Sequence, residues 1–195
     1  MALKDVLIDE LRDMYSAENQ LVKALPKLAK GAKSSELRKL FTDHLEETKG
    51  QVERLKNVFE TLDTEPTGEH CNGMQGVIEE GSDALEKDED GASFDCGIIG
   101  AALRTEHYEI AGYTATIAMA KTLKMSDIVD LLQQNLEEEE NAAKKVLTAA
   151  QAILKESASE PESRKGPKSA KEKSSDKKSK EDEKNAAPGL HKRSA

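Results

Sequence analysis

Apolar residues recur at intervals of three and four along most of residues 1–155, with charged residues between them. This spacing matches the 3.6 residues of a helical turn and predicts amphipathic helices. The pattern breaks near Gly31, over 63–68 and over 86–91, where turn-forming or polar residues gather. It therefore predicts four long helices, with a shorter helix over residues 71–86 between the second and the third.

One long crossover among short turns is the arrangement of a ferritin-like bundle rather than of a simple up-down bundle. We therefore expect an all-α fold, a ferritin-like antiparallel four-helix bundle with a short extra helix in the long crossover. An all-β fold is excluded, because aromatic residues make up only 3% of the chain and sandwiches and barrels depend on them.

Composition divides the chain after residue 155. Residues 156–195 hold eleven basic and eight acidic residues, a net charge of about +3, and a single leucine as their large aliphatic residue. Such a segment cannot bury enough apolar surface to offset its conformational entropy, so we predict a disordered tail rich in Lys, Ser and Glu. The bundle domain over 1–155 then carries a net charge of about −12.

The chain begins without a secretory signal pattern and has no apolar run long enough to span a membrane. We expect a cytoplasmic protein without a membrane partner, in which Cys71 and Cys96 are reduced thiols. The lysines of the tail, such as Lys177 and Lys178, are interrupted by acidic residues and lack interleaved aromatics. This composition favours a solvated tail over a nucleic-acid tether.

Polar residues interrupt the apolar face of every long helix near its middle. The residues at these positions are Glu18, His44, Glu47, Glu106, Glu109 and Glu138. Antiparallel packing would bring the four interruptions to a similar height in the bundle. Because an unpaired buried carboxylate costs several kcal/mol, a cation would have to compensate these side chains if they point inward.

Periodicity alone leaves two interpretations of these residues open. Carboxylates and imidazole are suitable ligands for iron or manganese, and a two-metal site in a bundle combines single Glu residues with Glu-x-x-His pairs. In an acidic domain, however, glutamates also fall on the flanks of helices, where they stay solvated. A metal site and a set of solvated flanks are both hypotheses at this point.

Three segments resemble the YciE/YciF-type family of ferritin-like bacterial stress proteins. They are LIDELRDMYSAENQL (7–21), DHLEETKGQVERL (43–55) and EHYEIAGY (106–113), and CNGMQGVIEE (71–80) is similar to that family as well. The resemblance covers residues 3–155. It implies a ferritin-like homodimer with a dinuclear metal centre and a role in osmotic, oxidative or general stress.

The resemblance also implies a ligand set for two iron or manganese ions, namely Glu18, His44, Glu47, Glu106, Glu109 and Glu138. The chain departs from the general pattern, because Gly50 and Asn141 stand where a His would complete each Glu-x-x-His pair. His107 is as compatible with a place beside the ligands or on the surface as with a ligand. For Tyr113 we favour core packing over hydrogen bonding to a ligand carboxylate.

Two functions follow as hypotheses, and whether a reaction is catalysed is left open. The first is a stress-response protein with a dinuclear iron or manganese carboxylate site that handles peroxide, oxygen or metal. The alternative is a non-catalytic helical-bundle stress or interaction protein without a functional metal site. The sequence has neither a phosphate-binding Gly-rich loop nor a nucleophile elbow.

Overall fold

The computed structural model describes residues 1–67, 69–87 and 92–159 of the chain. Within these ranges the elements are helices and no strand occurs: α1 (Leu3–Gly31), α2 (Ser35–Thr61), α3 (Asn72–Leu85), α4 (Ala92–Thr122) and α5 (Ser126–Ser159). The predicted all-α fold is confirmed, including the short helix in the long crossover. α5 continues to Ser159, past the predicted domain boundary, and residues 160–195 of the predicted tail lie outside the described residues.

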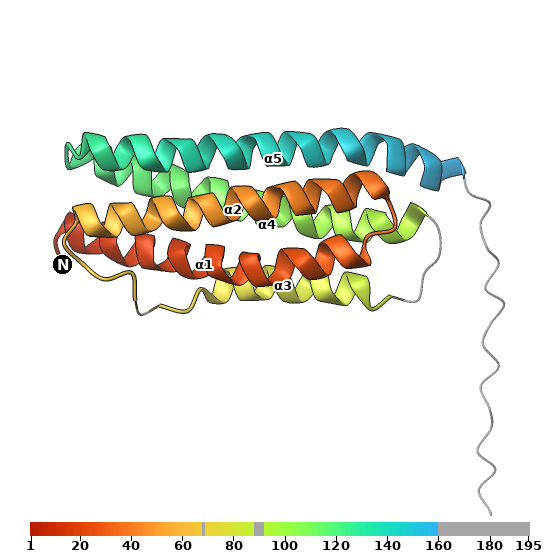
Figure 1. The fold of residues 1–195 in the computed structure, drawn as a ribbon, viewed down its shortest axis with the longest axis horizontal. Coiled ribbons are helices and arrows are strands. Elements are labelled where there is room, and N and C mark those ends of the chain that lie inside the picture. The colour runs from red at the N-terminus through yellow and green to blue at the C-terminus, as the bar shows by residue number, and fades with distance from the viewer. Residues whose placement is uncertain (68, 88–91, 160–195) are drawn as a thin grey trace, which may run out of the picture. The chain divides into compact units, whose positions relative to one another are not determined.

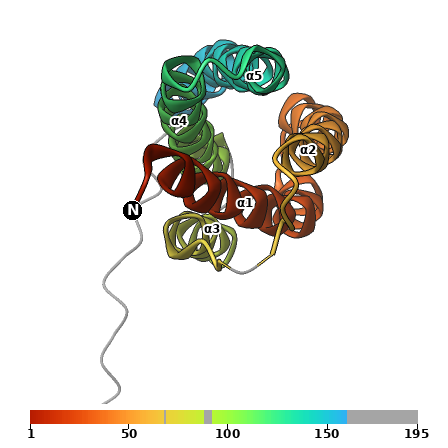
Figure 2. The ribbon, with the colours of Figure 1, turned by 90° about the vertical axis from the view of Figure 1, so that its left-hand side faces the viewer.

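The four long helices form an antiparallel bundle in which α1 contacts α2 and α4, and α5 contacts the same two helices from the opposite corner. Figure 1 shows that each contacting pair of long helices runs in opposite directions. The connection between α2 and α4 crosses from one end of the bundle to the other and contains α3. This short helix packs on the outside of α1 and α4 (Figure 2).

Local sequence signals determine where the helices begin and end. Ser34 caps α2, because its Oγ accepts hydrogen bonds from the backbone amides of Glu36 and Leu37 at 3.2 and 3.4 Å. α1 ends at Gly31, where a β-carbon would overlap a methyl group of Leu85 at the end of α3. A glycine at this position therefore allows the Leu85 side chain to pack closely against the end of α1.

The interior of the bundle consists of two apolar clusters with polar residues between them. One cluster includes Leu21, Leu37, Phe41, Ile98 and Val146, and the other includes Leu11, Leu55, Phe59, Ile117 and Leu132. The buried polar residues between the clusters, which we call the polar layer, are Glu18, His44, Thr48, Gln51, Thr105, Glu106, Glu109, Asn135 and Glu139. All four long helices contribute to this layer, as the interrupted apolar faces predicted.

Two further expectations concern the thiols and the membrane. Cys71 and Cys96 are both thiols rather than partners in a disulfide. Among the described helices, none has the length and apolarity needed to cross a membrane.

Candidate metal centre

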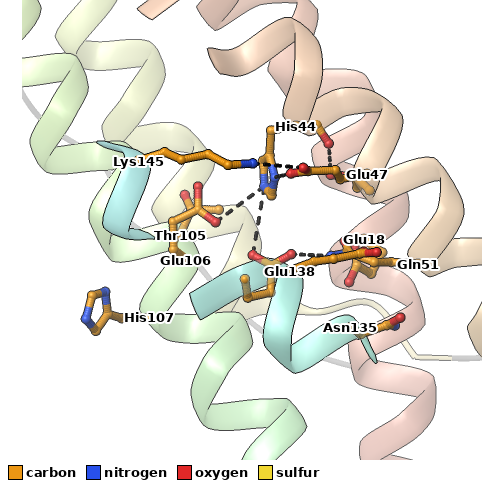
Figure 3. A network of polar contacts seen from close by, with 12 residues as sticks. Glu18, His44, Glu47, Gln51, Thr105, Glu106, His107, Asn135, Glu138 and Lys145 are labelled. Carbon is orange, nitrogen blue, oxygen red and sulfur yellow. Dashed lines mark hydrogen bonds and ion pairs between the residues drawn. The ribbon is translucent and has the colours of Figure 1, made fainter. Parts of the chain in front are cut away.

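The polar layer contains four carboxylates and one imidazole that the bundle almost completely removes from solvent. Glu18 comes from α1, His44 from α2, Glu106 and Glu109 from α4, and Glu139 from α5, and none is more than 5% exposed. One ligand atom from each of the last four residues lies within 4.8 Å of the others. Side chains from α2, α4 and α5 thus converge on one place inside the bundle, near His44 and Glu106 in Figure 3.

His44 presents one ring nitrogen to this cluster. Its Nδ1 lies 3.4 Å from Glu47 Oε2, and because a carboxylate can only accept, Nδ1 is assigned as the donor. Nε2 then points toward Glu106 Oε2 at 3.3 Å and Glu139 Oε2 at 3.9 Å without hydrogen-bonding geometry. Burial alone would lower the pKa of His44, but the hydrogen bond to Glu47 and the charge of Glu139 raise it above its usual value.

Glu18 is held by a series of donors that crosses the bundle. Arg54 Nε donates to Asn135 Oδ1, Asn135 Nδ2 donates to the Tyr113 hydroxyl at 2.9 Å, and that hydroxyl donates to Glu18 Oε1. We call Arg54, Asn135 and Tyr113 the donor chain. Because every hydrogen bond in it points toward Glu18, one carboxylate oxygen is fixed as an acceptor and the other remains available.

When the carboxylates are ionised, seven buried polar atoms of the layer have no hydrogen-bond partner within the described part of the protein. They are Glu18 Oε2, His44 Nε2, Gln51 Oε1, Glu106 Oε2, both carboxylate oxygens of Glu109, and Glu139 Oε2. Each unsatisfied group costs about 1–3 kcal/mol, and more when it is charged. So many unsatisfied acceptors in one place form a cluster that could hold a metal ion.

The electrostatics of the carboxylates require compensation as well, either by a bound cation or by protons. Burial raises the pKa values of Glu18 and Glu106 well above the usual range, and repulsion from Glu139 raises them further. Burial likewise raises the pKa of Glu109, with a further contribution from the charge of Glu18. Two divalent cations would balance the four buried carboxylates, and oxygen donors with one imidazole fit manganese or iron. The residues present therefore fit the implied metal centre.

Glu47, which the sequence placed among the ligands, lies at the edge of the cluster. Its side chain is 30% exposed, and its Oε1 accepts a hydrogen bond from Lys145 Nζ at 2.9 Å. The hydrogen bond from His44 and the Lys145 ammonium lower the pKa of Glu47 to about 2. The structure therefore places Glu47 between the cluster and solvent, with both carboxylate oxygens already engaged.

The structure places the neighbouring residue Glu139, and not the predicted Glu138, in the buried cluster. Glu138 is 31% exposed and pairs with Arg54, whereas Glu139 is fully buried and accepts a hydrogen bond from Gln51 Nε2. Leu132 and Asn135 are buried on the inner face of α5. Glu139 lies on this face as well, because residues four apart share a helix face, and Glu138 does not. The burial of Leu136 and Ala143 beside Glu139 reflects the same phase.

The structure also shows where the two residues of α4 with open roles, His107 and Tyr113, lie. His107 is exposed, its Nδ1 donates to the Leu103 carbonyl at 2.8 Å, and it lies apart from the network (Figure 3). It is therefore a surface residue. Tyr113 is fully buried and packs in an apolar cluster, but it also donates to Glu18, a contact that the sequence analysis ranked below core packing.

The fold and the buried His/Glu cluster together define a ferritin-like helical bundle. Residues 2–159 match the family described as domain of unknown function DUF892, and the chain belongs to this family. The protein YciF of Escherichia coli (strain K12) is 41% identical over 138 residues, which are 70% of this chain and 83% of YciF. The resemblance noted in the sequence is thereby confirmed.

Solved structures show the same relationship. The crystal structure of the E. coli stress protein YciF matches with a TM-score of 0.77 at 37% identity, covering 80% of this chain and 98% of YciF. YcfI of Rhodopseudomonas palustris matches with a TM-score of 0.73 at 42% identity, covering 76% and 94%. A protein of Xanthomonas campestris pv. campestris, 20% identical with a TM-score of 0.62 over 78% and 94% of the two chains, shares the fold.

Proposed function

We propose that this protein binds two iron or manganese ions in the polar layer and uses them to handle peroxide, oxygen or the metal itself during stress. The observation that carries the proposal is the set of seven buried polar atoms without partners at one level of the bundle. The relation to E. coli YciF, which is described as a stress protein, supports the physiological context.

Each residue of the centre would have a distinct role. His44 Nε2, Glu106, Glu109 and Glu139 would hold the ions, and Glu18 would add the oxygen that Tyr113 does not use. When bound, two such ions supply redox chemistry and Lewis acidity. The apolar clusters on both sides would limit the access of water to them.

Two neighbouring side chains would orient the ligands. Gln51 Nε2 holds one oxygen of Glu139, and the Glu47 carboxylate fixes His44 in the tautomer that presents Nε2 to the cluster. Both hydrogen bonds orient the ligand, and the carboxylate that accepts the Nδ1 proton of His44 also increases the basicity of the imidazole. Gln51 is therefore a positioning residue that the sequence analysis did not select, although it lies on the predicted face of the second helix.

The alternative is a structural role in which the carboxylates bind no metal. It is supported by the relation to YcfI of R. palustris, for which a structural role has been suggested. In that case the buried carboxylates would be protonated, as the raised pKa values of Glu18, Glu106 and Glu109 permit.

Metal analysis of two adjacent glutamate variants separates these functions. Glu139 is fully buried in the cluster, whereas Glu140 is exposed. After loading with Fe²⁺ or Mn²⁺ and removal of excess metal, we expect about two ions per chain in the wild type and in Glu140→Gln. Glu139→Gln should lose at least one of them. A wild-type protein that retains neither metal under any loading condition would favour the structural role.

We also propose that the protein acts as a cytoplasmic homodimer. α5 leaves Leu147 and Leu154 about half exposed, seven residues apart and so on one face of the helix, where a second copy would cover them. Light scattering should give the mass of two chains, and the mass of a single chain at all concentrations would contradict the dimer.

A further inference from the structure

A surface groove with a volume of about 460 Å³ lies between α2 and α5. Charged side chains of both signs line it, among them Glu36, Glu47, Glu138, Lys144 and Lys145. Three acidic groups on the wall of a groove can attract a hydrated divalent cation, and the two lysines oppose that attraction. Whether the groove attracts a cation therefore depends on how these acidic groups and lysines are placed along it.

A second, smaller cavity adjoins this groove. Its volume is about 10 Å³, and its lining includes Phe41, His44 and Glu106. It shares Leu40, Glu47 and Lys145 with the wall of the groove. A space of this size holds about one water molecule, and two of the residues that line it, His44 and Glu106, belong to the cluster.

Glu47 and Lys145 line both cavities, and we call their ion pair the neck. Glu47 bridges the two sides, with one oxygen 3.4 Å from His44 Nδ1 and the other 2.9 Å from Lys145 Nζ (Figure 3). Lys145 is 47% exposed and its long side chain is flexible, so this ion pair can open at little cost. A divalent cation that displaces the ammonium group from Glu47 would then lie next to His44.

We propose that the groove between α2 and α5 is the metal entrance, that Glu47 is the carboxylate that receives the incoming divalent cation, and that Lys145 closes the neck. The inference rests on the proposed metal-binding function and gives Glu47 a role in transfer rather than in the final ligand set. The arrangement explains why Glu47 contacts His44 from the solvent side while the buried carboxylates contact it from within.

The rate of metal uptake tests this role separately from the amount of metal bound. Stopped-flow absorption of Co²⁺ reports the replacement of water by protein ligands. Uptake should become about two- to fivefold faster in Lys145→Met, the range that an exposed ion pair can account for. It should become slower by a similar factor in Glu47→Gln, and Lys145→Met should bind as much Co²⁺ at equilibrium as the wild type.

Lys49→Met is the matched control, because Lys49 is 50% exposed and forms a similar ion pair with Glu46, at 2.7 Å, on α2. It should take up metal at the wild-type rate, and circular dichroism should show that all three variants are folded. If Lys145→Met fails to fold, Lys145→Gln replaces it.

The possible failures are distinguishable. If the wild type and both variants take up Co²⁺ at the same rate and bind it fully, the proposed entrance is contradicted and the proposed function is not affected. The loss of one Co²⁺ ion per chain from Glu47→Gln at saturating Co²⁺ would make Glu47 a ligand instead. A wild-type protein that binds no Co²⁺, Fe²⁺ or Mn²⁺ would overturn both proposals.

Discussion

The acidic groups at the two ends of the polar layer, Glu18 and Glu47, have different surroundings. At the closed end, the donor chain fixes Glu18 through hydrogen bonds that start from Arg54 on another helix. At the open end, Glu47 and Lys145 form a partly exposed ion pair beside a groove. In the proposed metal centre, one end would set the geometry of the ligands, whereas the other would allow exchange with solvent.

The largest expected effect is a change in the sign of the pH dependence of stability when metal is added. The raised pKa values of Glu18, Glu106 and Glu109 mean that the metal-free folded protein holds protons that the unfolded chain releases above about pH 4.5. Their contribution is present below that pH and is lost as pH rises. The raised pKa of His44 acts in the same direction above about pH 6.5.

Metal reverses this trend, because protons compete with it for the ligands. Urea unfolding of the metal-free protein should therefore show decreasing stability from about pH 5 to about pH 8, and the Mn²⁺-loaded protein should show increasing stability. The lowered pKa of Glu47, about 2, adds no slope in this range. A Glu106→Gln/Glu109→Gln variant should flatten both profiles, and parallel profiles with and without metal would contradict the account.

The second effect concerns the closed end. Tyr113→Phe removes the donor to Glu18 and leaves Asn135 Nδ2 without its acceptor, so we expect a loss of about 1.5–3 kcal/mol in the free energy of unfolding. Metal affinity should fall as well, measured by competition with a chelator. Tyr108→Phe is the control, because Tyr108 lies on the same helix and contacts Asp13 and Cys71 outside the polar layer. It should leave metal affinity unchanged.

The smallest expected effect is a difference in stability between variants of Arg54, at the closed end, and of Lys145, at the open end. Arg54 is 20% exposed and donates to both Asn135 and Glu138, so Arg54→Met should cost about 1–3 kcal/mol of stability. Lys145→Met removes one exposed ion pair and should cost at most about 1 kcal/mol. Thermal or urea unfolding measures both. Equal losses would show that the two ends do not differ in the way proposed.

The sequence predicted the helices well, because their signals are local. Gly31 and Ser34 mark a turn, and polar residues near the middle of each apolar face predicted a buried polar layer. These features depend on the spacing of apolar residues along the chain and on the residues at helix ends. Tertiary packing did not change the helices that these local signals predicted.

The details of the site depend on packing and could not be predicted in the same way. Glu137 to Glu140 are four consecutive acids, so composition cannot show which of them faces inward, and the phase of α5 against its neighbours selects Glu139. The donor chain joins α2, α4 and α5 through residues far apart in sequence, and no local pattern links Arg54 to Tyr113.

The most direct test of the central claim is a crystal structure of the protein loaded with Mn²⁺, with anomalous scattering used to locate the metal. The account predicts two anomalous peaks in the polar layer, within coordination distance of His44 Nε2 and the carboxylates of Glu106, Glu109 and Glu139. An ordered polar layer without anomalous peaks, at Mn²⁺ concentrations that saturate binding in solution, would contradict it.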